Sequence, residues 1–279
     1  MTTLPRSHRP LLGLAVTALL AGCAASAAKP TAVEANVTTK AVGYLDKTAV
    51  PDSLALVPAP PAAGSAGFAL DEQVSREARV LRSTPRFAQA TRDAELGFPA
   101  GANQFSCAID VDVDAVKTPA LYRLLERSRI DASAGTKVAK NHYQRARPFM
   151  VNNEPTCTPD DEAGLRRNGS YPSGHTFIGW AWALILSEIA PERADAIQAR
   201  GRNYGESRLV CNVHWQSDIL EGRFMGAAVI ARLRDNAGFQ KDLLAARREI
   251  AAAHARGEHS QRDCGAEEAV LKVRPASAL

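Results

Sequence analysis

Apolar residues recur every three or four positions along most of the chain after residue 70, a spacing that places them on one face of an α-helix. In TPALYRLLERSRI, for example, Leu121, Leu124 and Leu125 share a face. Pro85 interrupts an early helical stretch, and Pro148 is expected to end another, because the residue before a proline avoids the α region. The pattern predicts helices over residues 75–96, 118–130, 132–147, 176–190, 192–208, 215–234 and 239–254, followed by a tail after 257.

One of these stretches is apolar almost all round. Residues 176–190 read TFIGWAWALILSEIA, and a helix without a polar face is normally buried. As a membrane span the stretch is short and carries Glu188, and Pro191 ends it. We therefore expect a central buried helix in an all-α fold, a compact helical bundle.

Residues 107–116, CAIDVDVDAV, depart from this pattern and alternate apolar and acidic residues as a strand does. Asp110, Asp112 and Asp114 suggest a calcium loop, but glycine at its sixth position and glutamate at its twelfth are missing. The DxDxV sequence also resembles the aspartate nucleophile motif of haloacid dehalogenase-like phosphatases, whose fold alternates strands and helices. Because the chain offers few other strands, we interpret the stretch as a solvated acidic turn that leads into a helix.

The N-terminus has the pattern of an export signal. Arg6 and Arg9 precede LLGLAVTALLAG, an apolar run too short to span a bilayer comfortably. The run ends in LAGC, which resembles the lipobox of bacterial lipoproteins and makes Cys23 the expected lipidation site. Ordinary signal cleavage within residues 24–28 is the alternative. Both predict a periplasmic protein, and Ala24 after a lipidated cysteine predicts an outer-membrane anchor.

Composition adds the domain organisation and excludes one class of partner. We expect residues 1–22 to be a signal peptide with lipobox, residues 23–67 an irregular Ala- and Pro-rich linker, and residues 68–279 one folded domain. Residues 1–22 contain two arginines and no acidic residue, so their removal lowers the net charge from +4 to +2. So small a charge does not indicate nucleic-acid binding.

Basic and histidine residues gather in separate segments, and the first pair is Lys140 and Arg147. The two residues are seven positions apart, close to two helical turns, so both face the same way on one helix. A pair of solvated cations near a helix C-terminus is the alternative interpretation.

The second cluster is PSGH, which directly precedes the apolar helix. The backbone N–H groups of a first helical turn have no internal partner and form an anion site. Ser173 can donate a hydroxyl, Gly174 permits close approach, and His175 stands beside them. Ser173 as a plain N-cap is the alternative.

The third cluster contains Arg208, His214 and Asp218. Asp218 follows His214 by one helical turn, so its carboxylate can hold one imidazole nitrogen as a donor and leave the other free to attack. An exposed ion pair of little energetic consequence is the alternative.

Together the clusters read K-x6-RP, PSGH and SR-x5-H-x3-D, in that order, which resembles the signature of the type 2 phosphatidic acid phosphatase (PAP2) superfamily. The flanks HYQRARPF, NGSYPSGHT, GWAWAL and GESRLVCNVHWQSD resemble more specifically the bacterial class A non-specific acid phosphatases. The resemblance covers roughly residues 100–250. It implies a helical bundle of the PAP2 type that hydrolyses phosphate monoesters, with no metal and no other cofactor.

The resemblance also implies a role for each matching position. His214 is the expected nucleophile that forms a phosphohistidine, and Asp218 is expected to orient it. His175 is expected to protonate the leaving alcohol and then to activate water. The implied phosphate-binding residues are Lys140, Arg147, Ser173, Gly174 and Arg208.

Two other functions fit the same residues. Vanadium haloperoxidases share this anion site with vanadate in place of phosphate, and a lipoprotein that binds phosphate without turnover is the non-enzymatic alternative. An integral lipid phosphatase is not expected, because only the N-terminal segment is a candidate for contact with a membrane. The expected partners are therefore small phosphomonoesters, with the lipid anchor as the sole membrane contact. Monomer and homo-oligomer both stay open.

Four cysteines remain after Cys23, and an even number in an exported chain predicts disulfides. The chain has no CxxC pair, so a zinc site is not expected. Four cysteines allow three pairings. We prefer Cys157 with Cys211, because each lies in a segment that flanks the motifs, which leaves Cys107 with Cys264.

Overall fold

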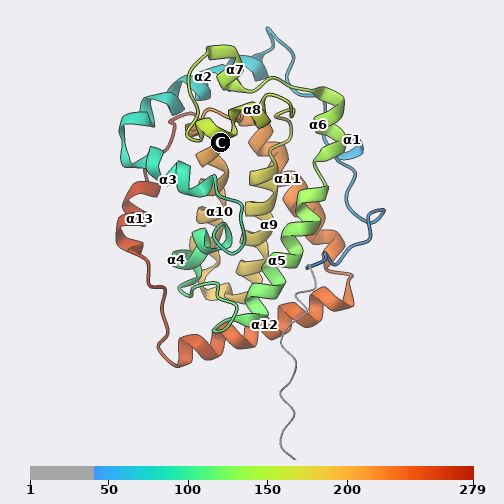
Figure 1. Cartoon of the computed structure of the whole chain (residues 1–279), viewed down its shortest axis with the longest axis vertical. Coiled ribbons are helices and arrows are strands. Elements are labelled where there is room, and N and C mark those ends of the chain that lie inside the picture. The colour runs from blue at the N-terminus through green and yellow to red at the C-terminus, as the bar shows by residue number, and fades with distance from the viewer. Residues whose placement is uncertain (1–40) are drawn as a thin grey trace, which may run out of the picture. The chain divides into compact units, whose positions relative to one another are not determined.

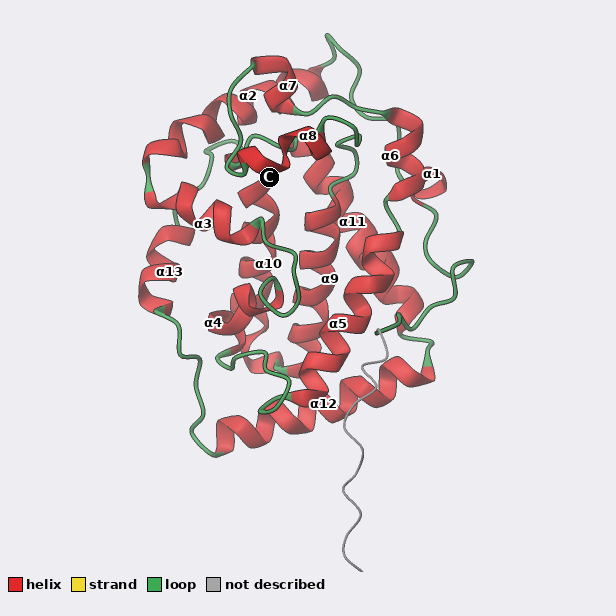
Figure 2. Cartoon of the chain, viewed as in Figure 1, coloured by secondary structure: helices red, strands yellow, loops and turns green. Residues whose placement is uncertain are grey.

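The structure of the protein, a computed structural model, describes residues 41–279. Those residues form helices and loops without a β-strand, which confirms the all-α fold class (Figures 1 and 2). Residues 41–279 lie in one compact unit. No helix within residues 41–279 combines the length and apolarity needed to cross a bilayer. The predicted signal peptide and Cys23 lie outside the described residues.

Short loops and 3-10 turns join the helices. In chain order the α-helices are α1 (Ser53–Leu56), α2 (Ala66–Val80), α3 (Pro85–Asp93), α4 (Ser106–Ile109), α5 (Pro119–Ala134), α6 (Lys137–Tyr143), α7 (Pro148–Asn152), α8 (Glu162–Leu165), α9 (Gly174–Ile189), α10 (Ala194–Val210), α11 (Gln216–Leu233), α12 (Ala237–Ala255) and α13 (Cys264–Leu271). The 3-10 turns are η1 (Leu81–Ser83), η2 (Ala102–Phe105), η3 (Pro159–Asp161) and η4 (Pro191–Arg193).

Helix α9 lies in the middle of the bundle and packs against α5, α10, α11 and α12 (Figure 1). Neighbours on so many sides explain why its sequence lacks a polar face. Trp182 is buried, and its Nε1 donates to the carbonyl of Leu125 at 3.0 Å, which satisfies the indole N–H. The predicted central helix is therefore confirmed.

Glycines on both neighbouring helices allow α9 to approach them closely. A Cβ atom on Gly205 of α10 would lie 2.9 Å from Thr176 Cγ2. A Cβ atom on Gly222 of α11 would lie 2.7 Å from the carbonyl oxygen of Ser173. A larger residue at either position would push the first turn of α9 away, so these contacts determine where that turn lies.

The prediction of one helix over residues 132–147 is wrong about where that helix ends. Helix α5 ends at Ala134, and the short α6 stops at Tyr143, because Gln144 takes a left-handed conformation with φ of 42°. Pro148 begins α7 where the prediction had it end a helix. Proline suits the first helical position, since the N–H that it lacks has no partner there.

The acidic stretch after residue 107 forms a turn, as interpreted from the sequence. Asp110 adopts a left-handed conformation directly after α4. Asp114 accepts hydrogen bonds from the backbone N–H groups of Val116 and Lys117, both at 2.8 Å. Its carboxylate thereby closes the turn that leads into α5.

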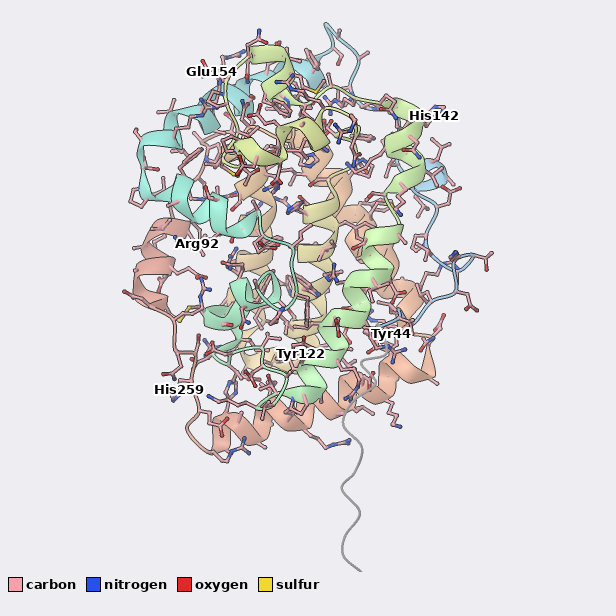
Figure 3. The ribbon with its side chains drawn as sticks, viewed as in Figure 1. Tyr44, Arg92, Tyr122, His142, Glu154 and His259 are labelled. Atoms are coloured by element: carbon pink, nitrogen blue, oxygen red, sulfur yellow. A yellow bond between two sulfur atoms is a disulfide. The ribbon has the colours of Figure 1, made fainter. Side chains whose placement is uncertain are left out.

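Residues 41–67 were expected to belong to a linker, but they pack against the helices. The backbone N–H of Tyr44 donates to Asp131 of α5, and its hydroxyl donates to Asp242 of α12, both at 2.8 Å. Ser53 is buried, and its hydroxyl accepts a hydrogen bond from Ala139. Figure 3 shows Tyr44 beside α12. The folded unit therefore begins earlier than the composition suggested.

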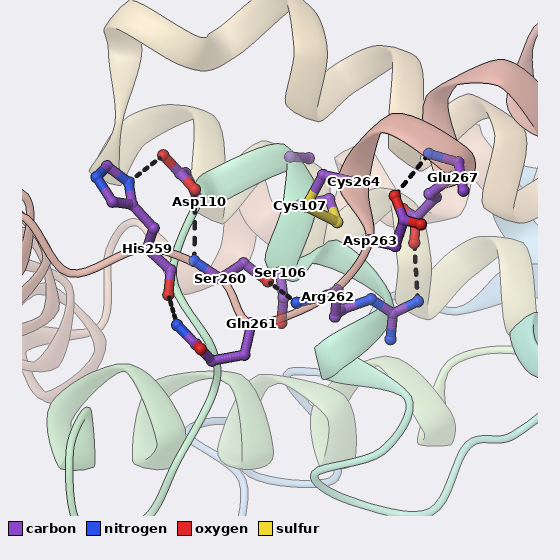
Figure 4. The surroundings of a disulfide bond; sticks show 12 residues. Ser106, Cys107, Asp110, His259, Ser260, Gln261, Arg262, Asp263, Cys264 and Glu267 are labelled. Carbon is purple, nitrogen blue, oxygen red and sulfur yellow. Dashed lines mark hydrogen bonds and ion pairs between the residues drawn. A yellow bond between two sulfur atoms is a disulfide. The ribbon is translucent and has the colours of Figure 1, made fainter.

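Both preferred disulfides are present, Cys157–Cys211 and Cys107–Cys264. The second pins the start of α13 to α4, so the segment after residue 257 is more than a tail (Figure 4). Next to this disulfide, His259 Nδ1 lies 2.9 Å from Asp110 Oδ2, and Arg262 donates to Glu267 at 2.8 Å. These contacts hold the C-terminal segment against the bundle.

Candidate active site

The three sequence clusters meet at one end of the bundle, the end where Figure 1 shows α6, α7 and α8. Lys140 on α6 and Arg147 at the N-cap of α7 both donate to the carbonyl of Gly169. Arg147 Nη1 lies 3.1 Å from His214 Nε2. The backbone N–H of Ser173 donates to the carbonyl of Asp218 at 2.9 Å. Residues from four separate helices are thus brought together by direct contacts.

His214 and Asp218 form a buried, oriented pair at the start of α11. Asp218 Oδ2 accepts a hydrogen bond from the backbone N–H of Trp215 at 2.9 Å and lies 3.0 Å from His214 Nδ1. A carboxylate oxygen is an acceptor, so Nδ1 carries the proton and Nε2 presents its lone pair. That lone pair points toward the guanidinium of Arg147.

The electrostatic surroundings keep His214 neutral. Burial lowers the pKa of its imidazole well below the ordinary value, and Arg147, Lys140 and Arg208 lower the pKa further. An uncharged imidazole with a free Nε2 is the form that can attack an electrophile.

Lys140 and Arg147 are buried cations whose partners, apart from the His214 ring beside Arg147, are main-chain carbonyls. Lys140 Nζ donates to Gly169 at 2.7 Å and to Ser170 at 3.1 Å. Arg147 donates to the carbonyls of Leu165, Asn168, Gly169 and Val213. Burial lowers the pKa of Lys140 to about 7 and that of Arg147 to about 10.

Arg208, in the last turn of α10, has still fewer partners within the described residues. It is 2% exposed, and its Nη1 contacts the sulfur of Cys211 at 3.8 Å. Its Nε has no hydrogen-bond partner in residues 41–279. Burial lowers its pKa to about 10. A buried guanidinium in this state gains strongly from an anion beside it.

The start of α9 adds neutral donors to these cations. Ser173 is the N-cap, and its hydroxyl oxygen accepts from the N–H of Thr176 at 3.3 Å and from the Thr176 hydroxyl at 2.9 Å. Its own hydroxyl proton is therefore free to donate elsewhere. Among residues 41–279, apart from its own helical turn, the nearest atom to a Cβ built on Gly174 would be Thr136 Oγ1 at 3.7 Å.

His175 is tethered through one ring nitrogen. Its Nε2 lies 2.9 Å from the carbonyl oxygen of Ala94, so Nε2 carries a proton and Nδ1 is left for other chemistry. Burial lowers the pKa of His175 well below the ordinary value, and the charges of Arg208 and Arg147 lower it further.

Ser207, the serine of the SR motif, has a different environment from Arg208. It is fully buried, donates to Asp93 and accepts from Arg86 at 2.9 Å. Arg200 also pairs with Asp93. This buried network joins α3 to α10 and supports the backbone that carries Arg208.

Sequence reasoning missed two residues beside His214 and Asp218. Arg145 Nη1 donates to Asp218 Oδ1, and its Nη2 donates to Asp71 Oδ2, both at 2.7 Å. The flank HYQRARPF contains Arg145 and could have suggested it. Asp71 lies in α2, about 150 residues before Asp218 of α11 in the sequence, and it belongs to none of the three motifs.

Within residues 41–279, no three His, Cys, Asp or Glu side chains gather in a way that could hold a metal ion.

Comparison with known proteins agrees with this geometry. Residues 129–238 match the PAP2 superfamily. The chain is 44% identical over 218 residues to a non-specific acid phosphatase of Providencia stuartii, covering 77% of this chain and 88% of that protein. It is 40% identical to an acid phosphatase of Zymomonas mobilis, covering 71% and 75%, and 38% identical to a non-specific acid phosphatase of Salmonella typhimurium, covering 70% and 78%.

The helical fold and the match over residues 129–238 are those of a PAP2 superfamily protein. Within that superfamily, the chain belongs to the family of bacterial non-specific acid phosphatases.

Proposed function

We propose that this protein is an exported acid phosphatase that hydrolyses phosphate monoesters through a phosphohistidine on His214, without a metal ion. The observation that carries the proposal is the set of buried cations Lys140, Arg147 and Arg208, which are held by carbonyls and a sulfur instead of carboxylates. They lie beside a neutral histidine whose Nε2 is unprotonated and accepts a hydrogen bond from Arg147 in the ligand-free protein.

The first step transfers the phosphoryl group to the enzyme. The cations, the Ser173 hydroxyl and the amide of Gly174 bind the phosphoryl oxygens, and Gly174 leaves room for them. His214 Nε2 forms a bond to phosphorus as the ester P–O bond breaks. His175 Nδ1 gives its proton to the departing alcohol oxygen.

The second step releases phosphate. His175, now neutral, removes a proton from a water molecule as that water attacks phosphorus. The P–N bond to His214 breaks, and inorganic phosphate leaves with His175 protonated again. Asp218 stabilises the His214 imidazole through Nδ1 during both steps.

The depressed pKa of His175 fits this cycle once substrate charge is considered. In the ligand-free protein, Arg208 and Arg147 oppose protonation of His175. A bound phosphate dianion offsets their charge and raises the pKa of His175. The substrate therefore creates the proton donor that its own leaving group requires.

Lys140 supports a preference for acidic pH. Its pKa of about 7 in the ligand-free protein means that the anion site holds its full positive charge only below neutrality. Three fixed cations also supply the charge stabilisation that a metal ion provides in other phosphatases, which supports the proposal of metal independence.

The names of the relatives favour phosphate ester hydrolysis over the haloperoxidase and over a non-catalytic phosphate carrier. The histidine pair also has no use in a mere carrier. We further propose export, with Cys23 lipidated at the outer membrane, on the strength of LAGC after an apolar run.

Trapping of the intermediate tests the mechanism, with EDTA-treated enzyme so that turnover also tests metal independence. Rapid quenching at neutral or alkaline pH during p-nitrophenyl phosphate hydrolysis should yield phosphohistidine on the peptide 209–223. His214→Ala should abolish adduct and turnover. His175→Ala should lower turnover of alkyl phosphates by about 10²- to 10⁴-fold, and of the activated aryl ester by less. An adduct on His175, activity in His214→Ala, or loss of wild-type activity in EDTA would contradict the proposal.

A further inference from the structure

Arg145 lies behind the histidine–aspartate pair, on the side away from Nε2 of His214. Its Nη1 donates to Asp218 Oδ1 and to the hydroxyl oxygen of Ser217, both at 2.7 Å. Asp218 Oδ2 is thereby left for His214 and for the N–H of Trp215. Each carboxylate oxygen has its own partners, so the carboxylate cannot rotate without breaking hydrogen bonds on both sides.

Asp71 of α2 holds Arg145 in turn. Its Oδ2 accepts from Arg145 Nη2 at 2.7 Å and from the Ser217 hydroxyl at 2.6 Å, while its Oδ1 accepts from the Ser217 N–H at 2.7 Å. Asp71 is 1% exposed and Asp218 is fully buried. The result is a chain of alternating charge from Asp71 through Arg145 to Asp218, and Asp218 in turn contacts the neutral His214.

Two aromatic rings confine the guanidinium between these carboxylates. Its carbon lies 5.6 Å from the ring centre of Trp215 and 5.8 Å from that of Tyr171. The Trp215 ring is fixed by a hydrogen bond from its Nε1 to the carbonyl of Ala146 at 2.8 Å. These contacts hold the Arg145 guanidinium in place. Within the described part of the chain, the guanidinium contacts none of the residues assigned to anion binding.

We propose that Arg145, held by Asp71, is a positioning residue that orients Asp218 and thereby aims His214 Nε2 at phosphorus. This inference rests on the proposed phosphohistidine mechanism. Because the guanidinium binds Asp71, Ser217 and Asp218, it acts on the attack step and leaves phosphate binding alone.

The charges around His214 come from every element that packs against it. Lys140 of α6, Arg147 before α7, and Arg208 of α10 are positive, and they stay in place in the variants below. His175 of α9 faces the same cluster, and Asp218 of α11 is the carboxylate that contacts the ring. Because these other charges stay constant, the loss of one charge at position 145 or 71 should shift the pKa of His214 in a defined direction.

Steady-state kinetics and NMR titration of His214 test the proposal in the full-length protein. Arg145→Gln should lower kcat by about 10²-fold through misplacement of the nucleophile, with inhibition by inorganic phosphate changed by less than about twofold. The lost positive charge should raise the pKa of His214 and move the acidic limb of kcat/KM to higher pH. Asp71→Asn removes a negative charge, so it should lower the pKa of His214 and move the acidic limb of kcat/KM to lower pH.

Two further variants separate positioning from folding. Arg145→Lys keeps the charge but loses the forked contact, so kcat should fall while the acidic limb stays at the wild-type pH. Asp242→Asn removes another buried carboxylate, which lies on α12 and pairs with Arg123 and Arg127 of α5. This substitution should lower the stability without moving the acidic limb of kcat/KM. Thermal unfolding is measured for every variant.

Each outcome of these experiments either supports or contradicts the proposed role of Arg145. Opposite shifts of the His214 pKa in Arg145→Gln and Asp71→Asn, with phosphate inhibition retained, support the proposal. Equal shifts, an unchanged kcat in folded Arg145→Gln, or a matching loss of phosphate affinity overturn it. The NMR titration needs no turnover, so it still tests the effect of the two charges on His214 if the wild-type protein hydrolyses no phosphate ester and the proposed function fails.

Discussion

Single residues at this site combine burial with charge in an uncommon way. Lys140 and Arg208 are 8% and 2% exposed, yet neither rests against a carboxylate in residues 41–279. Such groups are costly in an empty site, and an arriving anion offsets the cost. Phosphate affinity and the instability of the ligand-free site therefore have the same physical origin.

The pKa of Lys140 makes a prediction at this scale. Lys140→Gln should raise KM for p-nitrophenyl phosphate by roughly 10- to 100-fold at pH 5, because a charged hydrogen bond is lost. Above the pKa of about 7 the wild-type lysine is itself neutral in the free enzyme, so the gap between the two KM curves should narrow toward pH 8.5. Steady-state KM measured from pH 5 to 8.5 gives the comparison.

Arg147→Gln is the matched control for this prediction. Arg147 has a pKa of about 10 and stays charged across the same range, so its KM gap to wild type should remain constant. Parallel curves for wild type and Lys140→Gln would show that Lys140 does not lose its charge near neutrality.

At the scale of elements, the position of the α9 N-terminus depends on how closely α11 approaches it. The first turn of α9 carries Ser173, Gly174 and His175, and it packs where Gly222 leaves no side chain in the way. A helix N-terminus a few tenths of an ångström out of place would misdirect both its N–H groups and the proton donor.

Gly222→Ala should therefore lower both the unfolding free energy and kcat/KM. The new Cβ would lie 2.7 Å from Ser173 O and 2.9 Å from Thr176 Cβ, so we expect overpacking to cost about 1–3 kcal/mol of unfolding free energy. We expect kcat/KM to fall at least about tenfold as Ser173 moves. Thermal denaturation and kinetics measured on the same preparation give both quantities.

Gly164→Ala on α8 serves as the control, because a Cβ there lies more than 4 Å from the surrounding residues that the structure describes. It should leave activity and stability close to the wild-type values. Wild-type kcat/KM in Gly222→Ala would mean that α9 and α11 can separate without consequence for the site.

At the scale of the whole molecule, two disulfides join segments that are distant in the sequence. Cys107–Cys264 holds α13, and Cys157–Cys211 lies next to Arg208. Disulfides of this kind persist in an oxidising compartment, which agrees with the proposed export.

The proposed lipid anchor makes a prediction at this scale. Wild-type protein expressed in a bacterium should partition with the membrane fraction, because LAGC would direct acylation of Cys23. Cys23→Ala should release active enzyme into the soluble fraction or stall its processing. Fractionation with immunoblotting, together with mass spectrometry of the mature N-terminus, measures this. A wild-type N-terminus at Ala28 or Lys29 would refute the anchor.

Local patterns determined the class of the molecule. The apolar helix over 176–190 and the all-α fold follow from periodicity, because the face that a helix buries is written in its own sequence. The motif residues were also predictable, since each motif is a short run of the chain that can be recognised from residue types and spacing alone. The preferred disulfide pairs followed from their position beside those motifs.

Only the tertiary structure decided which distant groups meet. No local signal in the sequence pairs Asp71 with Arg145, because that contact joins segments that are far apart in the chain. The helix break at Gln144 was likewise missed, since packing overrides the propensity of so short a helix. Periodicity reports how one element meets its surroundings, whereas the identity of those surroundings depends on how all the elements pack together.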